Sequence, residues 1–385
     1  MSYERSVDPS VTDFTDRFYS ELIAKQAGGL ENTLISPLSL FVAMMITWYS
    51  TTGQTKNEIG RTLSLSEDTD GYSLLQTVGT RLNNFSSNPK VSLSSYNRLY
   101  LFGNTNRNRR ISNELHQLLH AGVTKFKPSI LPEDAREKIN NFIERKTAGM
   151  ITNMLPPGSI QSSTLMLLVN AMYFKGIWNE TFDKSKTSDA TFFGLTGSQK
   201  TVPMMHRRGA YPLCFMEDTM DQVIKLPFAD PKWELVIMLP KENDGLTNSL
   251  GGLLEGSLFQ NIMGCDFEQQ TVDLYLPRFQ LGGEKITDAL QILHNLGIND
   301  LFNSRADFSP LTTTKGLFVT KVVHKAVMKV DEDGAAAAAA TTVQLGLRSA
   351  FRPHRFRVDH PFLVMIAYNK SLPAFIGHFV EPESN

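Results

Sequence analysis

The spacing of apolar residues along the chain predicts several amphipathic helices. Three segments show apolar positions that recur every three or four residues: 11–26, 37–50 and 132–147. In the first segment, Phe14, Phe18 and Leu22 would share one face of a helix, so we expect this helix to pack on a hydrophobic core. The third segment begins with a proline and acidic residues, which favour the first turn of a helix.

Other segments have the composition of β-strands. Runs rich in β-branched, aliphatic and aromatic residues occur at 165–173, 234–239, 272–276 and 362–368. These runs are mixed with the helical segments, which is typical of an α+β fold with several antiparallel strands. A length of 385 residues favours two domains, yet no linker, charge block or internal repeat divides the chain.

Composition narrows the class of protein. A hydrophobic content of 41% is sufficient for a large core. The formal net charge of −1 argues against a general role in binding nucleic acid or membranes. No apolar run approaches the ~20 residues of a membrane span. We therefore expect neither a nucleic-acid partner nor a transmembrane helix.

Two features of the sequence, its pair of cysteines and its N-terminus, bear on the cellular compartment of the protein. Cys214 and Cys265 show neither metal-ligand spacing nor a disulfide framework, so two unpaired buried thiols are favoured over a pair. The N-terminus has no apolar secretory stretch, which leaves a cytosolic chain, a leader outside this sequence, or unconventional export. Sequons at Asn84, Asn179 and Asn369 would permit glycosylation after secretion.

Residues 329–349 form the most informative stretch. Three acidic residues and Gly334 precede six consecutive alanines, two threonines and, further on, Arg348 and Ser349. One interpretation is a surface helix, because alanine has the best helix propensity and acidic residues suit a helix N-terminus. The other is a loop that later becomes a strand within a sheet, because alternate residues of a strand share a face. The residues that would share this face are all small: Ala335, Ala337, Ala339 and Thr341.

Enzyme motifs are not found in the chain. It contains no G-x-S-x-G, H-E-x-x-H or C-x-x-C sequence and no phosphate-binding glycine loop, and its eight histidines are scattered. We therefore expect no catalytic activity, no cofactor and no metal site.

Nine segments, taken together in order, resemble the serpin family. They are NTLISPLSL from Asn32, GQTKNEI from Gly53, LVNAMYFKGIWNETF from Leu168, VPMM from Val202, LGINDLF from Leu296, DFSPLT from Asp307, HKAV at 324–327, the hinge at 332–341 and FRVDHPFLVMI at 356–366. The resemblance covers nearly the whole chain. It implies an α+β fold in which residues 1–385 form a single domain of three β-sheets and about nine helices. It also implies an exposed reactive-centre loop, which with its hinge would span 332–357, and it favours the loop-to-strand interpretation of the alanines.

The resemblance further implies a mechanism. An inhibitory serpin is attacked by a serine protease, forms an acyl-enzyme, and inserts its severed hinge into the central sheet as an extra strand. The hinge residues matched here are Glu332, Gly334, Ala335, Ala337, Ala339 and Thr341, with alanine at 335 where the family more often has threonine. A non-inhibitory serpin, acting as a carrier or chaperone, is the alternative. Such proteins usually have bulky or charged hinge residues, and this hinge has only small ones after Gly334.

In inhibitory serpins the reactive bond lies a fixed distance beyond the hinge glycine, so the resemblance implies where this bond should be. Fourteen residues beyond Gly334 stands Arg348, and the intervening segment would span about 46 Å when extended. Arg352 is a poor candidate because it precedes a proline, and trypsin-like proteases cleave poorly before proline. Arg355 lies too far beyond the hinge glycine. The sequence therefore predicts cleavage between Arg348 and Ser349. A basic residue at this position selects a trypsin-like protease, whose specificity pocket holds a carboxylate.

Other roles also follow from the resemblance. It places Ser36, Ser39, Asn170 and His324 in a buried polar cluster that helps the central sheet to open and close. Trp178 would lie near the top of the opening, where the hinge enters. Without the resemblance, His324 would be interpreted as a hydrogen-bonded structural histidine and Trp178 as a core aromatic.

The segment after the reactive bond is basic. Residues 348–357 contain four arginines and a histidine but no acidic residue. This pattern suits an exposed strand that protects a sheet edge. It also suits an exosite for an acidic patch on the protease, formed by Arg352, Arg355 and Arg357, or a polysaccharide site. Heparin binding through the usual family helix is not expected, because residues 72–84 hold only one basic residue, Arg81. We expect a monomer that is extracellular or at the cell surface, with the cytoplasm as the alternative.

Overall fold

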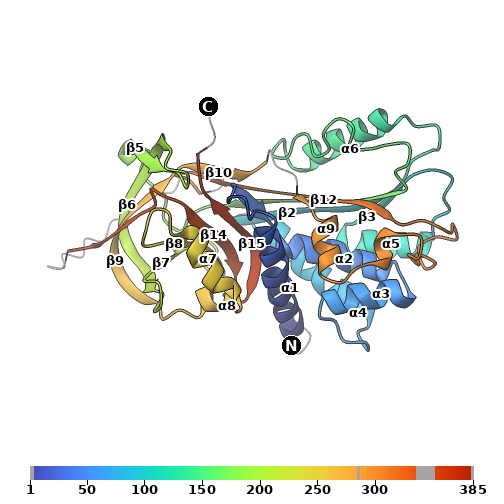
Figure 1. The fold of residues 1–385 in the computed structure, drawn as a ribbon, viewed down its shortest axis with the longest axis horizontal. Helices are drawn as coiled ribbons and strands as arrows, with labels where there is room; N and C mark the ends of the chain where they lie inside the picture. Colours follow the sequence, from blue (N-terminus) through green and yellow to red (C-terminus); the bar gives the residue numbers. More distant parts are fainter. Residues whose placement is uncertain (1–3, 284–286, 335–351, 383–385) are drawn as a thin grey trace.

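A computed structural model describes residues 4–283, 287–334 and 352–382 of the chain (Figure 1). Within these ranges the chain forms nine α-helices and two short 3₁₀ helices. They are α1 (Glu4–Ala24), α2 (Pro37–Tyr49), α3 (Gly53–Thr62), α4 (Gly71–Ser86), α5 (Arg109–Leu119), α6 (Pro132–Lys146), α7 (Leu246–Leu254), α8 (Leu258–Met263), α9 (Leu290–Asn295), η1 (Lys184–Lys186) and η2 (Asp300–Phe302). The three helices predicted from apolar spacing are confirmed as α1, α2 and α6, and the expected number of helices agrees.

Helix α2 shows how local sequence sets an element. Ser36 caps its N-terminus, because the Ser36 hydroxyl accepts a hydrogen bond from the backbone N–H of Ser39. Pro37 follows at the first helical position, where its missing N–H costs nothing. Every residue from Pro37 to Trp48 is buried, so α2 lies inside the molecule rather than on its surface.

One sheet, here called the central sheet, has strands in the order β10-β12-β4-β2-β3, with β11 also paired to β12. Its strands are β2 (Val91–Leu101), β3 (Gly122–Lys125), β4 (Met166–Gly176), β10 (Phe279–Gly282), β11 (Thr287–Asp288) and β12 (Val319–Val330). Strands β4 and β12 are parallel neighbours, paired from Val319 opposite Met166 to Met328 opposite Phe174. No described strand lies between them, so the sheet is closed along this pair.

The second sheet has nine strands in the order β1-β15-β14-β8-β7-β6-β9-β13, with β5 paired to β6. They are β1 (Thr33–Ile35), β5 (Ser188–Phe193), β6 (Gln199–Phe215), β7 (Gln222–Pro227), β8 (Trp233–Leu239), β9 (Glu268–Pro277), β13 (His354–Arg357), β14 (Phe362–Tyr368) and β15 (Leu372–Phe379). The expected three sheets are thus joined into two sets of hydrogen-bonded strands. The reason is that β6, at 17 residues, pairs with β5 at one end and with β7 at the other.

The central sheet has a hydrophobic cluster on each face. On one face Leu168, Met172 and Phe174 of β4 belong to the main core, which also contains α2. On the other face Val169 and Tyr173 pack with residues of α6. Because alternate residues of a strand point to opposite faces, any further strand in this sheet would also have two differently buried sides.

The prediction that the two cysteines are unpaired was wrong. Cys214 and Cys265 form a disulfide, with their Cα atoms 6.3 Å apart. Pairing of β6 with β9 sets Leu213 opposite Glu268, which brings Cys214, the next residue of β6, near Cys265, three residues before Glu268. This register joins segments 51 residues apart, so spacing along the chain did not reveal it.

The strands predicted at 165–173, 234–239, 272–276 and 362–368 are confirmed as β4, β8, β9 and β14. Among the helices that the structure describes, none is both long and apolar enough to cross a membrane.

Candidate functional site at the seam between β4 and β12

The seam, meaning the paired strands β4 and β12, contains a buried polar cluster. His324 of β12 is fully buried, and its Nε2 accepts a hydrogen bond of 3.0 Å from the backbone N–H of Ser36. Its Nδ1 faces the side-chain oxygen of Asn170 on β4. Burial lowers the pKa of His324 to about 3, so the ring is neutral at physiological pH and Nδ1 donates the proton.

Asn170 links this cluster across three elements. Its amide donates to the backbone oxygen of Ser39 at 3.0 Å and also contacts the Ser39 hydroxyl. On the other side it donates to Asn97 of β2. The four residues that the resemblance grouped are therefore in mutual contact, and Asn97 joins them. Because Asn170 and His324 bond across the seam, separating β4 from β12 would break a buried hydrogen bond.

After β12 the chain reverses in a turn at 331–334. Asp331 and Gly334 exchange two backbone hydrogen bonds, of 3.1 and 3.2 Å. Gly334 has φ of +110°, and a Cβ there would lie 2.3 Å from the backbone oxygen of Gly176. A glycine is therefore required both by conformation and by the close approach to the end of β4.

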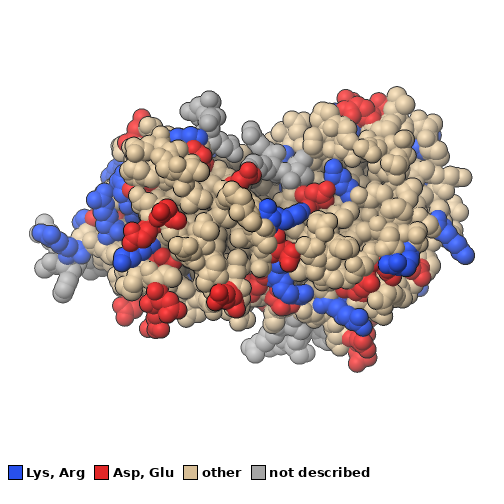
Figure 2. Space-filling model, viewed as in Figure 1, with Lys and Arg blue, Asp and Glu red and all other residues tan. Residues whose placement is uncertain are grey.

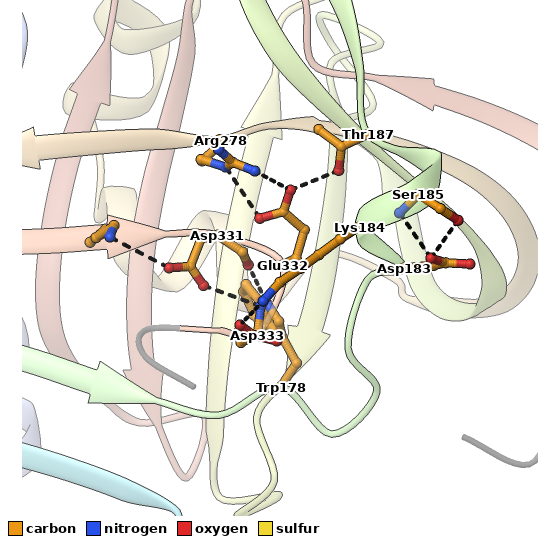
Figure 3. Close-up of polar contacts among 10 residues, drawn as sticks. Trp178, Asp183, Lys184, Ser185, Thr187, Arg278, Asp331, Glu332 and Asp333 are labelled. Atoms are coloured by element: carbon orange, nitrogen blue, oxygen red, sulfur yellow. Dashed lines mark hydrogen bonds and ion pairs between the residues drawn. The ribbon is translucent and has the colours of Figure 1, made fainter. Parts of the chain in front are cut away.

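Trp178 holds this turn against the end of β4 (Figure 3). Its Nε1 donates to the backbone oxygen of Asp331 at 2.9 Å, and its ring stacks on Phe228 with centroids 4.7 Å apart. The backbone N–H of Phe182 donates to the oxygen of Glu332 at 2.8 Å. The turn is thus docked by side-chain and main-chain bonds together.

The Glu332 side chain points inward and is only 3% exposed. Its carboxylate accepts from Arg278 at 2.5 Å and from Thr187 at 2.7 Å (Figure 3). Burial opposes ionisation, but these hydrogen bonds outweigh it and hold the pKa of Glu332 below its usual range. Asp333 is partly exposed and pairs with Lys184 at 2.7 Å.

Four of these contact residues were missed by sequence reasoning. Asn97, Lys184, Thr187 and Arg278 lie in segments with no motif of their own. Asn97 is a buried amide in a strand, and this is a weak signal. Arg278 sits between β9 and β10, and nothing along the chain indicates that Glu332, 54 residues later, is its partner.

Comparisons with known proteins identify the architecture. A family model described as Serpin (serine protease inhibitor) matches residues 9–382. The chain belongs to the serpin family. The leukocyte elastase inhibitor of Equus caballus is 32% identical over 362 residues, which cover 91% of this chain and 93% of that protein. Serpin B11 of Mus musculus is 30% identical over 384 residues, with 96% and 98% covered.

Solved structures agree with this assignment. Uncleaved ovalbumin is 25% identical, with a TM-score of 0.85 over 98% of this chain and 100% of that one. Human thyroxine-binding globulin, in a complex with thyroxine, is 24% identical with a TM-score of 0.87, covering 98% and 99%. At these identities the structures support the serpin fold, and the similar sequences link this serpin to a named protease inhibitor.

Several of the expected site residues lie outside the described part of this serpin. They are Ala335, Ala337, Ala339, Thr341, Arg348 and Ser349. The helical interpretation of the alanines also falls there. Of the proposed exosite residues, Arg352 precedes β13, whereas Arg355 and Arg357 lie on it.

Replacing Glu332 with Gln should lower the free energy of unfolding of this serpin by about 1–3 kcal/mol at neutral pH. A buried ion pair that loses one partner costs about 3–5 kcal/mol, and the 44% exposure of Arg278 reduces this figure. Urea unfolding measured by fluorescence would give the difference. Glu133→Gln, at an exposed ion pair on α6, is the control and should change stability by less than about 0.5 kcal/mol.

The contribution of Glu332 to the free energy of unfolding should also depend on pH. Because the folded-state pKa is depressed, the contribution is fully present above the unfolded value of about 4.5 and is lost as the pH falls through the folded pKa. The stability difference between wild type and Glu332→Gln should therefore shrink in acid. A difference that stays constant down to pH values below the folded pKa would contradict this account of Glu332.

Proposed function

We propose that this serpin is an irreversible inhibitor of trypsin-like serine proteases, and that the protease attacks the bond between Arg348 and Ser349. The supporting observation is the isolated antiparallel bridge between Gly334 and Ile177, just beyond the end of β4. If residues after Gly334 continued in this register along β4, Ala335 would lie opposite Gly176 and Ala337 opposite Phe174. Ala339 would then lie opposite Met172, and Thr341 opposite Asn170.

This register matches small hinge residues with the buried face of β4. Phe174 and Met172 belong to the main core, so each odd-numbered hinge residue would point inward, where only a small side chain fits. Thr341 would meet the polar cluster around Asn170, where its hydroxyl could bond. The hinge therefore has side chains suited to a strand inserted between β4 and β12, and its first bridge is already formed.

The chemistry is supplied by the protease. Its catalytic serine oxygen attacks the carbonyl carbon of Arg348, and the C–N bond to Ser349 breaks, with the proton passing through the protease histidine to the departing amine. An ester then joins Arg348 to the protease. Insertion of the freed hinge gains main-chain hydrogen bonds on both edges and carries the tethered protease along before water hydrolyses the ester.

Mixing the protein with trypsin tests the proposal. We expect a covalent complex that survives denaturing electrophoresis. Replacing Arg348 with Ala should slow its formation by about 100-fold or more, because the specificity-pocket carboxylate of trypsin would be buried without a partner. Arg352→Ala is the matched control and should still give the complex. Cleavage without a stable complex in the wild type would instead favour the non-inhibitory alternative.

The disulfide between Cys214 and Cys265 supports an extracellular or cell-surface location, because disulfides persist in oxidising compartments. A protease target in the same compartment would be reached without crossing a membrane.

A further inference from the structure

The strands next to the reactive loop carry a basic face that no single segment of sequence contains. Strand β13 ends the second sheet, β9 is its neighbour, and β6 follows. Registers place Arg355 opposite Asp273, Asp273 opposite Arg208, and Tyr275 between His206 and Arg357. Cross-strand partners share a face of a sheet. We call this set the basic face: His206, Arg208, Asp273, Tyr275, Arg355 and Arg357.

Tyr275 is the centre of the basic face. The His206 ring stacks on it with centroids 4.4 Å apart. The guanidinium carbons of Arg355 and Arg357 lie 5.4 and 5.3 Å from the Tyr275 ring centroid. These cation–π contacts hold the two arginines in place, so less side-chain entropy would be lost on binding a partner.

The charges of the basic face are only partly neutralised. Arg208 forms two hydrogen bonds with Asp273, at 2.8 and 2.7 Å, and Arg357 pairs with Asp359 at 2.8 Å. Arg355 makes no hydrogen bond or ion pair with any residue that the structure describes, and its contact is with the Tyr275 ring. The region is therefore net positive. Figure 2 shows Lys and Arg side chains gathered at this end of the molecule, which Figure 1 identifies by β6 and β9.

Edge protection alone does not account for the basic face. Charged side chains on β13 are explained by its place at the end of the sheet. Arg208, however, lies on β6, two strands in from β13, and its side chain is 61% exposed. This cation is aligned across β9 with those of β13, so the charged surface extends beyond the edge that β13 protects.

The basic face also lies within reach of the reactive bond. His354, at the start of β13, is six positions after Arg348, a distance of at most about 20 Å. A folded protease domain of 200 residues has a radius of gyration of about 16 Å, so its full width exceeds this distance. A protease bound at the loop is therefore wide enough to contact the strands that carry the basic face.

We infer that the basic face, with Arg352 beside it, is an exosite that binds an acidic surface patch of the target protease and speeds its association. This inference rests on the proposed inhibitory function. The partner is a protein surface rather than a sulfated polysaccharide, because Asp273 and Asp359 interrupt the arginines. Both carboxylates would repel a linear polyanion, whereas a protein patch of mixed charge can match both signs.

The experiment compares two double variants of equal charge change. One combines Arg352→Gln with Arg355→Gln. The control combines Arg109→Gln with Arg110→Gln on α5, which lies at the other end of the molecule (Figure 1). Association rate constants are measured with an anionic and a cationic trypsin at low and high salt. We expect the exosite variant to react about tenfold more slowly with anionic trypsin at low salt, with the same fraction of covalent complex.

Further outcomes separate this inference from the proposed function. The control variant should react with anionic trypsin as fast as the wild type does, and the exosite variant should not react more slowly than the wild type with cationic trypsin. High salt should remove the difference between the two double variants with anionic trypsin. Equal rates for both double variants with anionic trypsin would overturn the exosite. So would weaker retention on a heparin column without any change in those rates, since that result would assign the face to a polysaccharide.

A failure of protease trapping would not obscure the test. If the wild type formed no covalent complex, the affinity for anionic trypsin whose catalytic serine is replaced by alanine would still be measured. A weaker affinity of the exosite variant than of the wild type would support the exosite, and an equal affinity would overturn it. Arg208→Gln provides a second site on another strand and should weaken binding in the same direction.

Discussion

Cutting the bond between Arg348 and Ser349 should raise the melting temperature of this serpin by at least about 10 °C. In the proposed mechanism, β4 and β12, which are paired in this structure, separate and accept the severed hinge as a new strand once the loop is free. A strand of a dozen residues bonded on both edges makes roughly 20 backbone hydrogen bonds, each worth about 0.5–1.5 kcal/mol net. At an unfolding entropy of about 2.1 cal/mol/K per residue, about 10 kcal/mol corresponds to a rise of about 12 °C.

The measurement is a thermal melt of intact and nicked protein, with the nicked form separated from the protease. Circular dichroism or calorimetry would report the two transitions. If the nicked protein melted at the same temperature as the intact one, the native state would not be metastable and the trapping mechanism would have to be abandoned.

Replacing Ala337 with Arg should convert the inhibitor into a substrate. In the register set by the bridge between Gly334 and Ile177, residue 337 would lie opposite Phe174, whose side chain is fully buried in the main core. Insertion would then bury a guanidinium without a partner, at a cost of several kcal/mol. Hydrolysis of the acyl-enzyme would be faster than insertion, and trypsin would be released active.

The matched control is Ala336→Arg, with the same substitution one residue earlier. Residue 336 would lie opposite Lys175, which is exposed, so its side chain would reach solvent. We expect covalent complexes from Ala336→Arg and cleaved protein without complexes from Ala337→Arg, as seen by denaturing electrophoresis. If both variants trapped trypsin equally, the proposed register of insertion would be wrong. Nicked Ala337→Arg should also lack the rise in melting temperature.

Local patterns in the sequence predicted three of the described helices and four of the described strands. The apolar spacing in α1, α2 and α6 and the strand-like runs of β4, β8, β9 and β14 are properties of neighbouring residues, and each was confirmed. The polar cluster came from the resemblance rather than from pattern, because a lone serine or histidine has no periodic signal. The structure brings Ser36, Ser39, Asn170 and His324 into contact, although their part in opening the sheet stays a prediction.

Predictions failed or fell short where partners are distant along the chain. The disulfide depends on the register of β6 with β9, and the joining of sheets depends on the unbroken length of β6. Arg278 meets Glu332 because β10 and β12 are paired, which brings the ends of these strands together. None of these three features can be predicted from the conformational preferences of neighbouring residues.

The sequence by itself determined the family, three of the described helices, four of the described strands and the small residues of the hinge, because these depend on side-chain size and on spacing between neighbours. The tertiary structure decided the register in which Gly334 meets Ile177, the burial of Glu332 and the alignment of Arg208 with Arg355. Strand register fixes all three, since a shift of one residue turns every side chain of a strand to the opposite face.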